Sequence, residues 1–517
     1  MGARPPAAPP GKAAILAVAL TLLVTGCAPL LHSFGGGSVP HLPFDSPAWT
    51  QGIDPADAWL RHHLMRAEPA RAATLLRDRS PLRPRDDLLR DLQLGTVLHH
   101  AGRWLESDEA LARAEVEVDR RLARSVLRET GALTLSEGVL DFVPSPAERM
   151  MIPYYRMWNR LHQADVDGAV VEARRATSLL QDVDPHTDDA CDFLFLEWLS
   201  AFVYERAGEW NDALVALRRI DRVHERCGGP SPGVDLMRMA HASGFPDIAE
   251  EVADRYGLGD GEAAADGEAV VFVERGFAPH RTPGELHVPI FSDELDDLEA
   301  AGSGKIPALA ALVGARAVAN LAERQRWGAA FDDLPEVWLG NALGGAHILR
   351  VAWPSLAHAA SSSPSLHLVA DGRSTEGMSV GNLSRALTRD FHRDGTARML
   401  RAASRSLTRY VVSREVEKRT ERRGGEEAGA IAGFLSNMAL NVLDQPDLRA
   451  WSTLPAEITL VRMPLAAGEH RMVLEADGAR EIPLGTVATT AGQRLLLSHH
   501  AWADAPATIP RTAVVPR

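Results

Sequence analysis

The sequence predicts an α+β chain with several domains. Residues 54–258 have the apolar periodicity of helices, so we expect them to form an N-terminal helical array. Gly, Asp and Ala residues interrupt this pattern and predict a linker over 259–267. Short β-branched and aromatic runs follow, and they predict a mixed β/α domain over 268–445 and a small, β-sandwich-like C-terminal segment over 446–517.

Residues 1–26 predict a bacterial secretory signal. Arg4 and Lys12 precede an apolar run that is shorter than the roughly 20 residues of a membrane span. The run ends in Val-Thr-Gly-Cys, which resembles the lipobox of bacterial lipoproteins and implies a lipid on the thiol of Cys27. An ordinary signal peptide or membrane anchor with a chance cysteine is the alternative. Ala28 rather than Asp follows, which in a Gram-negative lipoprotein implies the outer membrane, facing the periplasm.

The predicted mature chain begins with a flexible segment. Residues 27–53 are rich in Gly, Pro and Ser, including Gly-Gly-Gly-Ser at 35–38. Such a composition is typical of a flexible linker. We therefore expect a tether that holds the first folded element clear of the membrane.

Repeated turns mark the helical array. Ala-Gly-Arg-Trp at 101–104 and Ala-Gly-Glu-Trp at 207–210 each lie between two apolar helical stretches, and Ala-Asp at 164–165 has the same place in a third copy. These residues resemble the tetratricopeptide repeat (TPR), in which small residues let paired helices pack closely and a glycine opens the turn. The copies are unevenly spaced, so we expect a degenerate TPR-like array. A generic helical bundle is the alternative.

Two cysteines remain in the predicted mature chain, Cys191 and Cys227. They lie at nearly equal distances before and after the turn at Gly208, so two antiparallel helices would bring them level. In an oxidising periplasm we expect a disulfide that joins the open end of this hairpin. Two buried free thiols are the alternative.

The second half alternates predicted strands with two helices. The strands cover 269–273, 285–290, 347–353, 365–370, 457–463, 470–475 and 493–498. We expect a basic, solvated helix over 382–422, balanced by nearby acidic residues, or else a contact for an acidic partner or lipid phosphate. An apolar helix over 429–443 is expected to pack on the sheet, and a membrane-touching helix is the alternative. The glycine turns after Pro464 resemble those of envelope-associated PEGA-type modules, which imply binding or spacing.

Three motifs in this half stand out. The first is a strand that ends in Glu274 and is followed by Gly276 and Pro279, and the second is Val-Ala-Trp-Pro at 351–354. The third, at 447–455, contains Asp447, Arg449, Trp451, Leu454 and Pro455. Together they resemble a family of uncharacterised bacterial lipoproteins that contain tetratricopeptide repeats. The family has no established activity, and the resemblance implies an interaction or structural role for these residues.

A purely structural reading of the motifs is the alternative. Arg449 would then stack on Trp451, and Glu274 would pair with a neighbouring arginine. The Leu454-Pro455 turn would start the next strand.

Composition and motifs predict no catalytic, metal or cofactor site. Gly-Ser-Gly-Lys at 302–305 lacks the other residues of a phosphate loop. Histidine pairs occur at 62–63, 99–100 and 499–500, but adjacent side chains diverge on a helix, so we expect surface or capping histidines rather than metal ligands. The net charge of −14 argues against nucleic-acid binding.

Together these features predict a non-enzymatic scaffold. The chain is expected to meet the membrane through its N-terminal lipid and to bind envelope proteins, such as cell-wall synthesis factors or other lipoproteins, on the concave surface of its helical array. The alternative is a peptidoglycan- or carbohydrate-binding protein or hydrolase, because the chain's 11 tryptophans offer surfaces for stacking on sugars.

Overall fold

The computed structural model describes residues 53–78, 87–128, 141–259, 267–291, 312, 347–357, 365–393, 395–425, 446–476, 481–501 and 513–514. The predicted signal peptide, Cys27, nearly all of the tether and the predicted apolar helix over 429–443 lie outside these residues. None of the described helices is long and apolar enough to cross a membrane.

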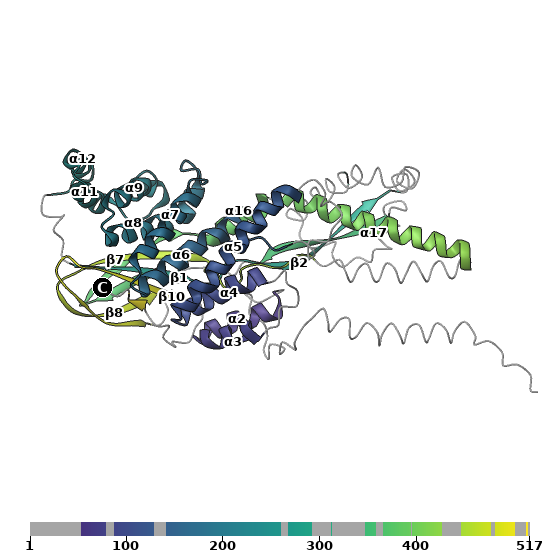
Figure 1. Ribbon diagram of the computed structural model, residues 1–517, viewed down its shortest axis with the longest axis horizontal. Coiled ribbons are helices and arrows are strands. Elements are labelled where there is room, and N and C mark those ends of the chain that lie inside the picture. Colours follow the sequence, from purple (N-terminus) through teal and green to yellow (C-terminus); the bar gives the residue numbers. More distant parts are fainter. Residues whose placement is uncertain are drawn as a thin grey trace, which may run out of the picture.

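Helices occupy almost all of the described chain before residue 258 (Figure 1). They are α2 (Pro55–Met65), α3 (Pro69–Asp78), α4 (Asp87–His100), α5 (Trp104–Arg128), α6 (Pro146–His162), α7 (Val166–Leu180), η5 (Asp188–Phe193), α8 (Leu194–Ala207), α9 (Trp210–Asp221), α10 (His224–Cys227), α11 (Gly233–Ala242) and α12 (Pro246–Tyr256). Consecutive helices pack as the hairpins α4–α5, α6–α7, α8–α9 and α11–α12.

The predicted turns lie inside these hairpins. Gly102 and Gly208 have φ angles of 72° and 76°, and Ala164 takes the same left-handed conformation at 58°. This conformation is open to glycine at little cost. The indoles of Trp104 and Trp210 come within 3.9 and 3.8 Å of the position that a Cβ atom would take on the preceding glycine, so each ring packs back on its turn.

Three groups of strands form the rest of the chain. A five-stranded sheet has the order β11 (Ala513–Val514), β10 (Arg494–Ala501), β1 (Gly267–Arg275), β7 (Glu457–Leu465), β6 (Met378–Gly381). A four-stranded sheet has the order β5 (Arg373–Glu376), β4 (Leu366–Ala370), β8 (Gly468–Ala476), β9 (Ile482–Thr489). Strands β2 (His280–Ile290) and β3 (His347–Ala357) pair with each other, and β3 contacts the long helix α17 (Gly395–Gly424).

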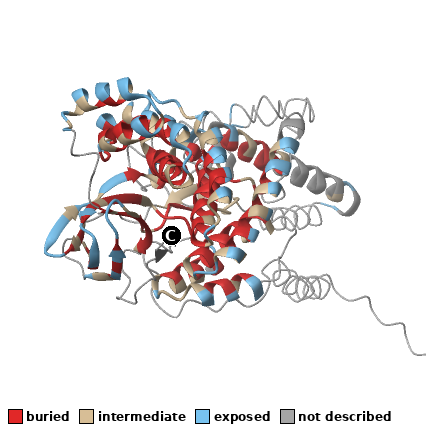
Figure 2. Cartoon of the chain, turned by 60° about the vertical axis from the view of Figure 1, so that its left-hand side comes forward, coloured by how far each residue is buried: buried red, intermediate tan, exposed pale blue. Residues whose placement is uncertain are grey.

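The five-stranded sheet lies between two hydrophobic cores. Side chains alternate along β1, so Val270 and Phe272 join the core shared with the helices, whereas Val271 and Val273 join the core shared with the four-stranded sheet. Buried residues therefore continue from the helices through both sheets (Figure 2). We call α4, α6 and α8 the inner helices, because they pack toward the sheet, and α5, α7 and α9 the outer helices.

The sheet order changes the predicted domain division. Both sheets contain strands from both sides of the boundary expected at residue 446, so this boundary does not divide the structure. The physical reason is that β1 has both edges paired with C-terminal strands, in parallel with β10 and antiparallel with β7. The facing sheets do form a sandwich, but β1, β4, β5 and β6 from the earlier segment are part of it.

The predicted basic helix over 382–422 is two helices, α16 (Leu383–Arg393) and α17. The first arginines of this segment are not balanced only by acidic residues on their own helix. Arg385 and Arg389 donate hydrogen bonds to opposite oxygens of buried Asp192 in η5, each at 2.7 Å. This part of the basic face is therefore a contact within the molecule.

Cys191 and Cys227 form a disulfide with Cα atoms 5.2 Å apart. Cys191 lies just before α8 in η5, and Cys227 ends α10 just after α9. The bond therefore joins the open end of the α8–α9 hairpin.

We expect loss of this disulfide to destabilise the protein. A Cys191→Ser, Cys227→Ser double variant should lose about 2–4 kcal/mol of unfolding free energy, because the unfolded chain is no longer constrained. Urea denaturation of both proteins, with and without a thiol reductant, measures the difference. Reduced wild-type protein should match the variant, and identical transitions for oxidised and reduced wild-type protein would contradict the expectation.

Candidate functional site

The first and third sequence motifs meet at one place, where α2, α4 and α6 contact the ends of β1 and β10. We call this contact the junction. Arg61 of α2 connects the two motif segments directly: its guanidinium donates hydrogen bonds to the backbone oxygens of Ala278 at 2.9 Å and Ser452 at 2.8 Å. Arg61 is fully buried, and burial lowers its pKa to about 10. A buried guanidinium with these partners fixes both segments against the helices.

Trp451 is the anchor of the third motif. Its indole N–H donates to the hydroxyl of Thr96 on α4 at 2.9 Å, and its backbone N–H donates to the carboxylate of Glu148 at 2.9 Å. The same Glu148 side chain accepts a hydrogen bond from the backbone of Ser145, which completes a capping box at the start of α6. One carboxylate thus both starts a helix and holds the motif.

Glu274 lies at the centre of the junction. It is 2% exposed, and it is the last residue of β1 that faces the helices. The Tyr155 hydroxyl donates to its Oε2 at 2.9 Å, and Nδ1 of His500 lies 3.0 Å from the same oxygen. Nε2 of His100 lies 3.7 Å from that oxygen. The expected pairing of Glu274 with an arginine is therefore replaced by a tyrosine and two histidines.

The prediction of surface or capping histidines is wrong for two of the three pairs. His99, His499 and His500 are at most 6% exposed, and the side chain of His100 is 7% exposed. The contact is between histidines of different pairs. His100 comes from the helical layer and His500 from the sheet, and their ring centroids lie 4.5 Å apart. Burial, followed by the neighbouring histidines, lowers the pKa of His100 and of His500 well below the usual value.

The remaining motif residues shape the loops around the cluster formed by Glu274, His100 and His500. Gly276 has φ of 60°, and its N–H donates to the backbone oxygen of Ala501 at 3.0 Å. The backbone oxygen of Leu454 accepts from Ala278 at 2.9 Å, so the Leu454-Pro455 turn leads into β7. Pro279 and Pro455 are buried, as is Leu454.

Asp447 and Arg449 lie apart from the cluster. Nε of Arg449 donates to Asp447 at 2.8 Å, so the side chains form an ion pair. The guanidinium also lies over the ring of Phe142, 5.9 Å from its centroid. The expected stacking of Arg449 on Trp451 is replaced by these contacts.

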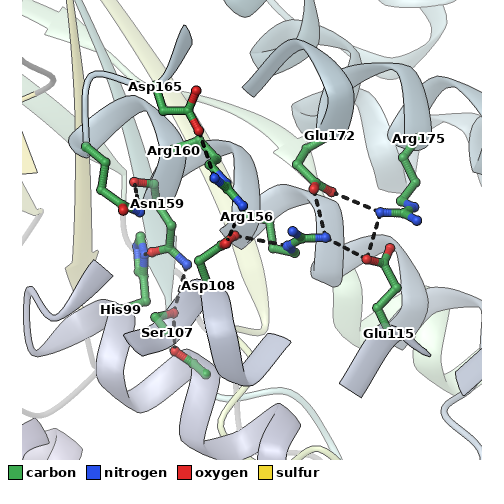
Figure 3. Close-up of polar contacts among 12 residues, drawn as sticks. His99, Ser107, Asp108, Glu115, Arg156, Asn159, Arg160, Asp165, Glu172 and Arg175 are labelled. Atoms are coloured by element: carbon green, nitrogen blue, oxygen red, sulfur yellow. Dashed lines mark hydrogen bonds and ion pairs between the residues drawn. The ribbon is translucent and has the colours of Figure 1, made fainter. Parts of the chain in front are cut away.

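A polar network continues from the junction into the helices (Figure 3). Nδ1 of His99 lies 2.8 Å from the Asn159 side-chain oxygen, and the Asn159 amide donates to Ser107 at 2.8 Å. Beside it, Arg156 contacts Asp108 at 3.0 Å, Glu115 at 2.6 Å and Glu172 at 2.7 Å. The network links α4, α5, α6 and α7, so the hairpins hold the histidine-bearing end of α4 in a fixed position.

A separate cavity of about 220 Å³ lies beside the disulfide, lined by residues that include Phe193, Leu194, Glu197 and Arg219. Glu197 is buried, and its carboxylate lies 3.6 Å from Arg219. Burial raises the pKa of Glu197 to about 7 despite this positive charge. The cavity thus combines apolar walls with one titratable carboxyl group.

The sequence identifies Glu274 and Trp451 but gives no sign of Tyr155, His100 and His500 as the partners of Glu274. It also gives little sign of buried Arg61, which joins the two motif segments. An arginine within an apolar stretch of α2 is a weak sign of burial. The partners of Glu274 come from two helices and a strand far apart in the chain, and only the folded structure brings them together. The chain matches no protein-family model and no curated protein.

We expect Trp451→Phe to weaken the junction. The change removes a buried hydrogen bond and part of a fully packed ring, so the unfolding free energy should fall by about 2–4 kcal/mol. Trp210→Phe is the matched control, because Trp210 is 40% exposed on its turn and its replacement should change stability by about 0.5 kcal/mol or less. Equal losses of unfolding free energy in the two variants, measured by urea denaturation, would contradict the expectation that Trp451 stabilises the junction.

Glu197 predicts a pH dependence of stability. Its pKa of about 7 in the fold, against an ordinary 4.5, means that the folded state retains a proton that the unfolded chain releases. The unfolding free energy should therefore fall as the pH rises from 4.5 to 7, with a slope approaching about 1.4 kcal/mol per pH unit.

The Glu197→Gln variant lacks this titrating carboxyl group. Its unfolding free energy, relative to that of wild-type protein, should therefore increase as the pH rises to 7. Urea denaturation at a series of pH values measures this difference. The comparison also separates the effect of Glu197 from that of Glu115, because burial likewise raises the pKa of Glu115 to about 7. Glu251→Gln on exposed α12 is the control. Parallel pH profiles for wild-type and Glu197→Gln protein would show the expectation to be wrong.

Proposed function

We propose that the chain is an outer-membrane-anchored periplasmic lipoprotein that acts as a protein-interaction scaffold in cell-envelope assembly or regulation. The lipobox-like segment ending at Cys27 supports the anchor, and the Cys191–Cys227 disulfide supports an oxidising compartment. The proposal includes a degenerate TPR-like array, for which the hairpins with left-handed turns at 102, 164 and 208 are the support.

The surface that carries the proposal is formed by the outer helices. They expose large apolar side chains: Val116 on α5 is 71% exposed, Val171 on α7 is 56% exposed and Val215 on α9 is 43% exposed. Surface ion pairs connect these helices, because Arg175 of α7 contacts Glu115 of α5 at 2.7 Å and Arg174 contacts Asp212 of α9 at 3.5 Å. Apolar residues on connected helices suit a partner protein with its own apolar side chains.

The inner helices suit a partner less well than the sequence suggests. In a helical array they would line the predicted concave surface, but here they pack against the chain's own sheet. Phe272 of β1 lies 5.5 Å from Trp158 of α6 and 6.3 Å from Phe202 of α8, measured between ring centroids. We therefore place partner binding on the outer helices.

The carbohydrate-binding alternative has less support. It needs tryptophan rings that are open to sugars. Among the described tryptophans, Trp158, Trp198, Trp353 and Trp451 are buried. Trp104 stacks on His162 with ring centroids 4.5 Å apart.

Crosslinking in living cells tests the scaffold. A photo-reactive amino acid at Val171 or Val215 of the full-length lipoprotein should give the same discrete product with an envelope protein. The matched control is Arg471, which is exposed on β8 of the four-stranded sheet and should not give this product.

Val171→Glu in the Val215-labelled protein should reduce that product severalfold while changing stability by about 0.5 kcal/mol or less, since the site is exposed. Cys27→Ser should reduce the product further by releasing the protein from the membrane. A product of equal yield from position 471, or one insensitive to Val171→Glu, would contradict binding on the outer helices.

A further inference from the structure

Three side chains in the junction form a group with the chemistry of a metal site. His100 ends α4, Glu274 lies near the end of β1, and His500 lies directly opposite it on β10. One potential ligand atom from each lies within 4.8 Å of the other two. Two imidazoles and one carboxylate are a ligand set that proteins use for Zn²⁺.

The distances are near those of a loaded site. Bonds of about 2.0–2.2 Å to a tetrahedral Zn²⁺ place any two ligand atoms roughly 3.3–3.5 Å apart. The Glu274 oxygen lies 3.0 Å from His500 and 3.7 Å from His100, so these two separations flank the required value. The three ligand atoms lie within 4.8 Å of one another, so binding one ion requires the two imidazoles to rotate toward each other.

We propose that His100, Glu274 and His500 bind one Zn²⁺ ion, which joins the helical layer to the sheet. The proposal goes beyond the scaffold function and does not depend on it. The two layers each supply ligands, because His100 belongs to an inner helix and the other two residues belong to adjacent strands. A fourth ligand position remains for a water molecule.

The surroundings suit a divalent ion. Neutral imidazoles are the form that binds metal, and burial keeps both histidines neutral by lowering their pKa. The Tyr155 hydroxyl donates a hydrogen bond to the Glu274 carboxylate, as residues around metal ligands commonly do. His100 lies at the end of α4 beside exposed Gly102 and Arg103, so the site is close to the surface.

Metal content of the full-length protein tests the proposal. The lipoprotein, purified in detergent with a tag that lacks histidine, should contain one Zn²⁺ per chain by mass spectrometry of the elements. Removal of the ion with a chelator should lower the melting temperature, and added Zn²⁺ should restore it. Co²⁺ bound in its place should give the visible absorption of a tetrahedral nitrogen and oxygen site.

Variants separate the ligands from their neighbours. Glu274→Gln, His100→Gln and His500→Gln should each weaken Zn²⁺ binding at least 100-fold, and Tyr155→Phe should weaken it about tenfold while preserving the stoichiometry. His499→Gln is the matched control, because His499 is adjacent and buried but lies on the opposite face of β10. Circular dichroism identifies the variants that fold.

Three results would overturn the proposal. The first is wild-type protein that binds no Zn²⁺ at micromolar concentration and melts at the same temperature with and without it. The second is unchanged binding by the folded Glu274→Gln variant, since that would place the ion elsewhere. Weakened binding in His499→Gln equal to that in His500→Gln would likewise contradict this ligand set.

Discussion

The parallel pairing of β1 with β10 is the constraint on which the rest of the structure depends. It joins side chains 226 positions apart in the sequence and places Glu274 opposite His500. It also completes the surface under the inner helices, because Phe272 of β1 and Leu496 of β10 belong to the same core as those helices. The inner helices therefore bury apolar side chains against strands from both the earlier and the later part of the chain.

The polar contacts at the junction determine how the helices lie on the sheet. A buried polar group without a partner costs about 1–3 kcal/mol, so hydrogen bonds there favour one registration of the helices over the sheet. Arg61, Trp451 and Glu274 each connect a helix to the strands or to the loops between them. A second charged contact does the same at α11, where Arg462 and Arg494 reach buried Asp235 at 2.6 and 2.5 Å. Burial alone would raise the pKa of Asp235, but the two guanidinium groups hold it well below its usual range.

Local signals allowed the sequence to predict the elements. The glycine turns at 102 and 208 identified hairpins, and short apolar runs identified β1, β4, β7 and β10. Spacing about Gly208 also paired Cys191 with Cys227, because two helices of similar length make sequence distance a measure of position. These predictions depend only on nearby residues and regular geometry.

The long-range features had no such signal. Nothing in the local pattern of β1 shows that its neighbours come from the C-terminal segment, so the predicted boundary at 446 runs through a shared sheet. The histidine pairs were judged as adjacent residues on one helix. The burial of His100 and His500 follows instead from the contact of α4 with β10, to which each pair contributes one histidine.

The position of the sheet also limits what the helical array can do. An array that binds partners on its inner face needs that face open, whereas here Val270, Phe272 and Leu460 fill it. Binding by the outer helices requires instead that these helices keep fixed positions relative to one another, with no ligand between them. The Arg156 network and the junction supply this rigidity from inside. A rigid outer surface would lose little conformational entropy on binding, and the proposed lipid anchor would raise the concentration of partners held at the same membrane.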